Sequence, residues 1–146
     1  MKWVTWQQIG VDRMGSIWLI RRWIDPRAEF LFVPPTTKPL PKGAEPFDIP
    51  GVRFSHHRGH CTFHSLVKEH NLKDPVLLRI ANIIDEADLV QEVNIEPVAP
   101  GLDAIRRGIR RTSVNDHEAL EREIFVYEAL YAELSAGESN HKEQGS

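Results

Sequence analysis

The chain has 146 residues, of which 41% are hydrophobic and 27% are charged, as is ordinary for one globular domain. Its formal net charge of −3 excludes a general attraction to nucleic acid or anionic membranes, and no apolar stretch is long enough to cross a bilayer. The single cysteine, Cys61, excludes an internal disulfide framework. Because the N-terminus also lacks a signal-like segment, we expect a cytoplasmic protein.

Hydrophobic periodicity predicts an α+β fold, mostly helical, with four to five helices packed against a small sheet of two to four strands. The proline-containing connections at 34–50 and 91–100 are expected to be irregular. We predict a single domain over residues 1–136 and a disordered polar tail over 137–146. The expected strands are 2–7, 29–33 and 51–55, and the expected helices are 11–24, 63–70, 75–88, 102–111 and one that opens at 115.

Three helix starts carry specific signals. Asp74 followed by Pro75 is typical of an N-cap and a first helical residue. Asn115 with Glu118 resembles a capping box, and Thr62 is a suitable N-cap for the helix that follows it. These residues set the expected starts of three helices.

The helix expected at 102–111 has a basic face. A charge run of this kind is usually a solvated surface, and the rest of the chain is acidic. The sequence therefore does not favour direct binding to DNA. The residues of this face are Arg106, Arg107, Arg110 and Arg111.

Residues 55–64 hold four of the seven histidines and the only cysteine. Imidazole and thiolate are the commonest protein donors for transition metals, so this segment indicates a metal site. Its spacing matches no standard zinc or metalloprotease motif. The alternative is a solvated histidine-rich loop.

Asp85 and Asp88 continue the buried face of the helix expected at 75–88. Two carboxylates at the inner edge of one helix make half of a metal site, because without a cation they repel each other. The alternative is that they pair with Arg13, with Arg21 or with the following helix.

Arg13 and Arg21 lie on the helix expected at 11–24, which is apolar nearly all round. A guanidinium on an apolar face needs a partner. That partner is either a structural carboxylate, such as Asp25 four residues after Arg21, or a bound oxyanion, which the planar guanidinium fits well.

Several segments together resemble a known family. The opening signature, Val11-Asp12-Arg13 followed by Trp18 to Pro26, is the specific part. The remaining segments are Ala28 to Pro34, Pro46-Phe47-Asp48-Ile49-Pro50-Gly51, His56-His57, Cys61-Thr62-Phe63, Pro100 to Gly108 and Tyr127-Glu128-Ala129-Leu130-Tyr131. Over about residues 2–134 the chain is similar to the ChrB-type domain of chromate-resistance proteins.

This resemblance implies an association with chromate resistance without specifying a reaction. Larger members carry the domain behind a regulatory region or behind a sulfurtransferase-like domain. The implied partners are therefore a regulatory or sulfurtransferase-like protein, with a homodimer also open. Because nothing precedes the domain here, we expect no repressor function. The chain departs from the family pattern at His64, where an acid is usual, and at Asp85, where a histidine is usual.

We hypothesise one metal site in which His57 and His64 supply nitrogen ligands and Asp85 and Asp88 supply carboxylates. Such a mixed set suits iron, manganese or zinc. Arg13 and Arg21 would hold an oxyanion such as chromate nearby. Additional candidate ligands are His56, His60, Cys61 and His117.

Two functions follow from this hypothesis. The first is a module that senses or detoxifies by binding a metal ion or oxyanion, as part of a stress response. The second is a metalloenzyme with redox or hydrolytic chemistry, for which a vacant coordination position is required. A third reading is an interaction domain whose polar cluster is structural.

Overall fold

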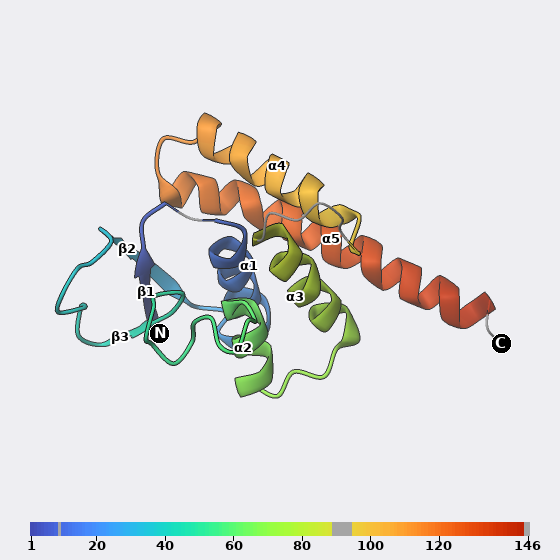
Figure 1. The fold of residues 1–146 in the computed structure, drawn as a ribbon, viewed down its shortest axis with the longest axis horizontal. Coiled ribbons are helices and arrows are strands. Elements are labelled where there is room, and N and C mark those ends of the chain that lie inside the picture. The colour runs from blue at the N-terminus through green and yellow to red at the C-terminus, as the bar shows by residue number, and fades with distance from the viewer. Residues whose placement is uncertain (9, 89–94, 145–146) are drawn as a thin grey trace.

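The computed structural model describes residues 1–8, 10–88 and 95–144. A three-stranded parallel sheet forms one side of the molecule (Figure 1). Parallel neighbours cannot be joined by a tight hairpin, so the chain must cross over between them. The strands lie in the order β2-β1-β3, where β1 is Lys2–Trp6, β2 is Glu29–Val33 and β3 is Ala44–Pro46.

The crossover between β1 and β2 is the helix expected at 11–24. It begins as α1 (Val11–Leu19) and ends as one π-helical turn, η1 (Ile20–Ile24). The backbone N–H of Asp25 donates to the Ile20 carbonyl at 2.6 Å, which closes the wider turn. The residues of α1 are almost all buried, as its apolar composition predicts.

Two predicted helix starts are confirmed. The Asp74 carboxylate accepts the Val76 N–H at 2.9 Å, and the Asn115 side chain accepts the Glu118 N–H at 2.9 Å. None of the helices in the described part of the chain is both long and apolar enough to span a membrane. These helices are α2 (Thr62–Glu69), α3 (Pro75–Asp88), α4 (Val98–Thr112) and α5 (Asp116–Gln144).

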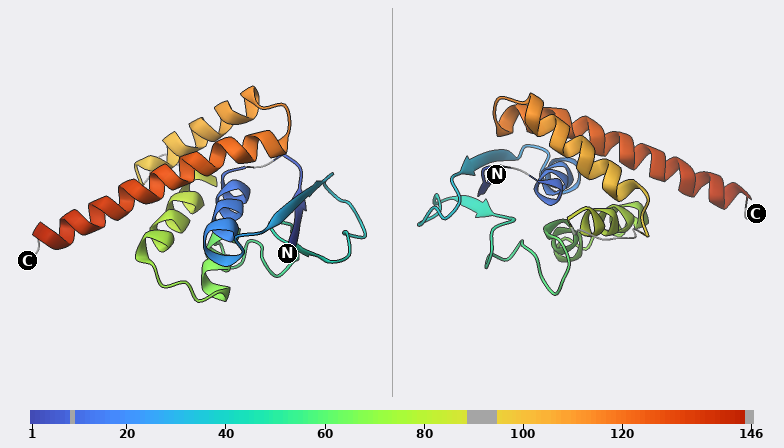
Figure 2. Two further views of the ribbon diagram at one scale, coloured as in Figure 1. Left: turned by 180° about the vertical axis from the view of Figure 1, so that it is seen from behind. Right: turned by 45° about the horizontal axis from the view of Figure 1, so that its top comes forward.

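Helix α1 is the centre of the fold. It lies between the sheet and the remaining helices (Figures 1 and 2) and packs against α2, α3 and α5. On its buried face the Trp18 ring stacks on Phe63 at 6.3 Å and on Tyr127 at 6.0 Å. The Tyr127 hydroxyl donates to the Val11 carbonyl at 2.7 Å, which fixes α5 along α1. The predicted α+β class is thereby confirmed.

Several predicted boundaries differ from the structure. Residues 51–55 form turns and one isolated bridge, Phe47 to Phe54, because Gly51 takes a left-handed turn conformation at φ +88°. The third strand is instead β3, inside the connection expected to be irregular. Pro46 is tolerated there because β3 is an edge strand. Helix α4 begins before residue 102, and helix α5 runs from Asp116 to Gln144.

Gly15 is needed where helices α1, α2, α3 and α5 meet. A Cβ added there would lie 2.7 Å from Ile84 Cδ1 and 3.2 Å from Tyr127 Cε1. Gly15→Ala should therefore lower the free energy of unfolding by about 1–3 kcal/mol, measured by urea denaturation, because the packed core must move to admit a methyl group.

Gly108→Ala is the matched control, since a Cβ at this position in α4 meets nothing within 4 Å. It should raise stability by about 0.5–1 kcal/mol through helix propensity. Equal effects of the two substitutions would contradict the packing role of Gly15.

Candidate metal centre

Asp12 lies in the first turn of α1, and its carboxylate also reaches the first turn of α2. Oδ2 accepts the Thr62 N–H at 2.8 Å, and Oδ1 accepts the Phe63 N–H at 2.9 Å. These N–H groups have no partner within their own helix, so the carboxylate satisfies both. The residue is only 3% exposed. Oδ1 also accepts the Ser16 hydroxyl at 3.4 Å, whereas Oδ2 keeps a further lone pair for another partner.

Asp48 approaches from the connection between β3 and α2. Its backbone is left-handed, at φ 53°, a conformation that aspartate tolerates better than most residues. Oδ1 accepts the Thr62 hydroxyl at 2.9 Å, and Oδ2 lies 2.8 Å from Arg13 Nε. Arg13 Nη2 also donates to the Asp48 carbonyl at 2.8 Å. Backbone and side chain of Asp48 are thus both fixed beside α1.

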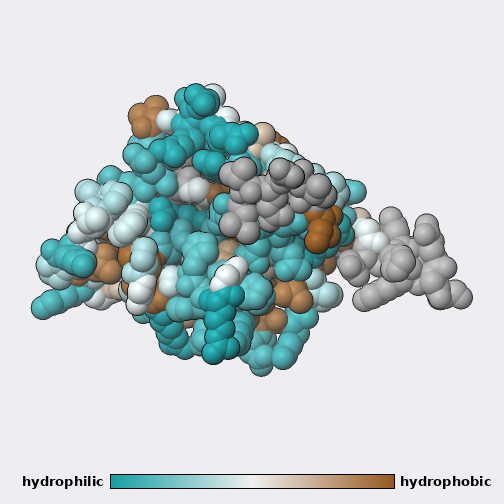
Figure 3. Space-filling view, in the orientation of Figure 1, coloured by the Kyte–Doolittle hydropathy of each residue, from teal (hydrophilic) through white to brown (hydrophobic). Residues whose placement is uncertain are grey.

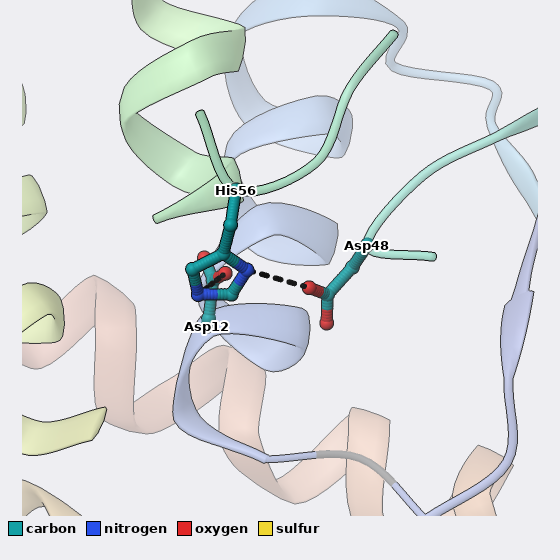
Figure 4. Close-up of side chains that lie close together, drawn as sticks. All are labelled: Asp12, Asp48 and His56. Atoms are coloured by element: carbon teal, nitrogen blue, oxygen red, sulfur yellow. Dashed lines mark ion pairs between the residues drawn. The ribbon is translucent and has the colours of Figure 1, made fainter. Parts of the chain in front are cut away.

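His56 lies between these two carboxylates (Figure 4). Its Nε2 is 3.5 Å from Asp12 Oδ2, and its Nδ1 is 3.8 Å from Asp48 Oδ1. Ligand atoms of the three residues all lie within 4.8 Å of one another. Asp88, at the end of α3, adds a third carboxylate 3.6 Å from His56 Nε2. We call these four residues, Asp12, Asp48, His56 and Asp88, the Asp12 cluster.

The Asp12 cluster is closed on one side and open on the other. The Asp12 side chain is 4% exposed, whereas that of His56 is 57% exposed. A cavity of about 410 Å³ opens beside the cluster, and its lining includes Arg13, Asp48 and His56. A small ligand can therefore reach the cluster from solvent.

Burial and neighbouring carboxylates oppose the ionisation of Asp12 and Asp88. Burial, together with the charge of Asp48, raises the pKa of Asp12 to about 7, although the Phe63 and Thr62 N–H groups lower it. Burial also raises the pKa of Asp88, which His56 partly offsets. A cation placed among these oxygens would favour the ionised form of each.

Among the described residues, Asp88 is the one member of the predicted ligand set that lies in this cluster. His57 turns away, with its Nε2 2.7 Å from the Arg53 carbonyl. The His64 ring stacks on His60 at 4.2 Å. His56, expected as an additional candidate, lies at the centre instead.

Asp85 takes part in a separate contact network. It accepts the Cys61 N–H at 2.8 Å and lies 3.3 Å from His60 Nδ1. Cys61 is buried beside the Ala81 carbonyl, and burial raises the pKa of its thiol, which disfavours the thiolate. His117 packs its ring edge-on against Phe32 at 4.9 Å, far along the chain from the other histidines.

The structure separates the two arginines of the predicted oxyanion site. Arg21 lies about 14 Å along the helix from Asp12, at 1.5 Å per residue, and its guanidinium covers the Phe30 ring at 5.1 Å. Asp25, its expected partner, instead contacts Trp3 Nε1 at 3.0 Å and the N-terminal ammonium at 3.2 Å. Arg13 has a carboxylate partner, Asp48, which is the structural alternative.

Asp12 and Asp48 were not among the predicted ligands. A lone aspartate in a helix and another in a long connection carry no spacing signal, because they come together only through the packing of α1 on the 34–61 connection. One signal was present: both lie in segments that carry the family resemblance, Val11-Asp12-Arg13 and Pro46 to Gly51.

The raised pKa of Asp12 predicts a pH dependence of stability. Because the folded state binds a proton up to about pH 7 and the unfolded state only to about 3.8, stability should fall as pH rises between these values. In the presence of a chelator, the free energy of unfolding should be roughly 1–3 kcal/mol lower at pH 7.5 than at pH 5.

Asp12→Asn should reduce this slope. Glu123, whose pKa burial also raises to about 7, contributes a change of the same sign, so Glu123→Gln serves as the comparison. The assignment to Asp12 is wrong if Asp12→Asn keeps the full dependence of the unsubstituted protein.

Comparison with known proteins identifies the family to which this chain belongs. The family described as the C-terminal domain of ChrB matches residues 3–134. The chain is 34% identical over 138 residues to the protein named Protein ChrB of Cupriavidus metallidurans strain CH34; the alignment covers 92% of this chain and 41% of that protein. The chain thus spans about two-fifths of that relative's length. No solved structure matches. The chain therefore belongs to the ChrB C-terminal domain family, the chromate-resistance domain that its opening segment resembles.

Proposed function

We propose that this ChrB-type domain binds one divalent transition-metal ion at the Asp12 cluster and acts as a sensing or detoxification module in chromate resistance. The observation that carries the proposal is the convergence of Asp12, Asp48 and His56 within 4.8 Å, with the Asp12 carboxylate buried and held by two N–H groups of the α2 N-terminus. Membership in the ChrB C-terminal domain family supports a role in chromate resistance. The geometry of the Asp12 cluster supports the binding of a metal ion.

The spacing of the cluster suits an ion. Ligand atoms about 2.0–2.2 Å from one metal lie about 3–3.5 Å from each other. The contacts of His56 with Asp12 and Asp48, at 3.5 and 3.8 Å, are near this range. One imidazole nitrogen would bind the ion, and because the His56 side chain is largely exposed, its ring has room to turn.

The charges also suit an ion. At neutral pH the cluster offers up to three carboxylates and has Arg13 as the cation paired with Asp48. The oxygens and one imidazole nitrogen form a set that favours manganese, iron or zinc over soft metals. Deprotonation of Asp12 on binding makes the expected affinity rise with pH.

His56→Ala is the direct test, with His57→Ala as the matched control. Titration calorimetry with Zn²⁺ and Mn²⁺ should show one site whose affinity falls at least about tenfold in His56→Ala, since a direct ligand is lost. His57 contacts a backbone carbonyl and should leave the affinity unchanged.

The reverse result, loss in His57→Ala alone, would instead place the ion with the ligands expected from the sequence. If neither metal binds the unsubstituted protein, the proposal fails, and the contacts of His56 with the carboxylates are then structural.

The cavity beside the cluster favours a second function, that of a metalloenzyme. It opens at His56 and Asp48, where a bound ion would keep positions for water or substrate. Water-proton relaxation of the Mn²⁺-loaded protein should then show at least one exchanging water on the metal. An ion without bound water would favour a purely binding role.

A further inference from the structure

A second cavity lies on the other side of the histidine segment. It has a volume of about 730 Å³ and runs along the exposed face of α2, in a region that is mostly hydrophilic in Figure 3. It shares no residue with the Asp12 cluster. We call it the basic cavity. Its lining comprises Arg53, His57, Arg58, His60, His64, Ser65, Lys68 and Glu69.

The rim of the basic cavity is a two-residue hairpin. The His57 N–H donates to the His60 carbonyl at 3.1 Å, and the His60 N–H returns a bond of 3.0 Å. Arg58 and Gly59 between them are both left-handed, at φ 52° and 79°. Turns of this type favour Asn-Gly, because an ordinary side chain at positive φ costs about 1–2 kcal/mol. Arginine therefore stands at a position where asparagine would be more stable, and its side chain lines the cavity.

The cavity holds an excess of positive charge. Arg53 is compensated by Glu69, at 2.9 Å. Neither Arg58 nor Lys68 has a carboxylate within ion-pair distance among the described residues. Arg58 and Lys68 thus face the cavity without a carboxylate of the protein to neutralise them. This is the arrangement expected if a bound anion neutralises their charge.

The remaining groups supply uncharged donors. Burial, and the neighbouring His60, lower the pKa of His64, so its ring is neutral at pH 7 and still offers one N–H. Lys68 follows His64 by one helical turn on the same face of α2. Guanidinium, ammonium and imidazole groups around one space are the donors that bind oxyanions.

We propose that the basic cavity binds a small oxyanion carrying two negative charges, of the phosphate and sulfate class. The site is independent of the metal centre. The volume also accommodates the organic part of a phosphate monoester, so the ligand is either the free ion or such an ester.

Arg58→Asn separates ligand binding from folding. Asparagine adopts the left-handed conformation readily, so this variant should be at least as stable as the unsubstituted protein. Titration of sulfate and of phosphate, followed by NMR shifts of the residues of the cavity at low chloride, should show affinity at least tenfold weaker in Arg58→Asn. Low chloride is needed because salt screens exposed charges.

Arg111→Gln, on α4, removes the same charge elsewhere and is the control. It should leave the titration unchanged, as should His56→Ala, which tests the metal centre separately. Tighter binding of glycerol 3-phosphate than of phosphate would assign the ligand to phosphate monoesters, and equal binding to the free ion. Unchanged affinity in Arg58→Asn, or equal weakening in Arg111→Gln, would overturn the proposal.

Discussion

One buried carboxylate joins helix α1 to helix α2 and lies at the centre of the proposed metal site. Asp12 lies in the first turn of α1 and accepts two N–H groups from the first turn of α2, so the positive ends of two helix dipoles meet at its oxygens. Hydrogen bonds to a charged group contribute about 1.5–3 kcal/mol each, which offsets much of the cost of burial. The raised pKa of Asp12 shows that burial and the charge of Asp48 still outweigh these bonds. Either a proton or a nearby cation would therefore stabilise this carboxylate.

The arrangement around Asp12 follows from the topology of the sheet. Parallel strands β1 and β2 require a crossover, and the crossover helix α1 is therefore packed on the sheet with its N-terminus at the end of β1. Arg13, the next residue, donates to carbonyls of Trp6, Gln7 and Gln8 at that end and pairs with Asp48. The first turn of α1 thus holds β1, the connection between β3 and α2, and α2 itself. The Asp12 cluster lies where these three segments meet.

The histidine segment, residues 55–64, borders both the Asp12 cluster and the basic cavity. His56 faces the carboxylates, whereas its neighbour His57 faces the Arg53 carbonyl and the basic cavity. Successive side chains of an extended segment point to opposite sides, so adjacent histidines separate rather than cooperate. The hairpin at Arg58 and Gly59 then returns the chain so that His60 approaches Asp85, and α2 begins just beyond it. Two proposed sites, one for a cation and one for an anion, consequently lie on either side of one short segment.

The sequence by itself determined the class of fold, the first two strands, the starts of α3 and α5 and the family, because each depends on local periodicity, capping residues or contiguous motifs. It also predicted a metal site built from histidines and inward carboxylates. Only the tertiary structure decided which of them meet. Asp12 comes from α1, Asp48 and His56 from the connection between β3 and α2, and Asp88 from α3, and no spacing along the chain encodes their approach. The third strand was likewise misplaced, because β3 is held by pairing with β1 at the sheet edge and not by its own proline-containing sequence.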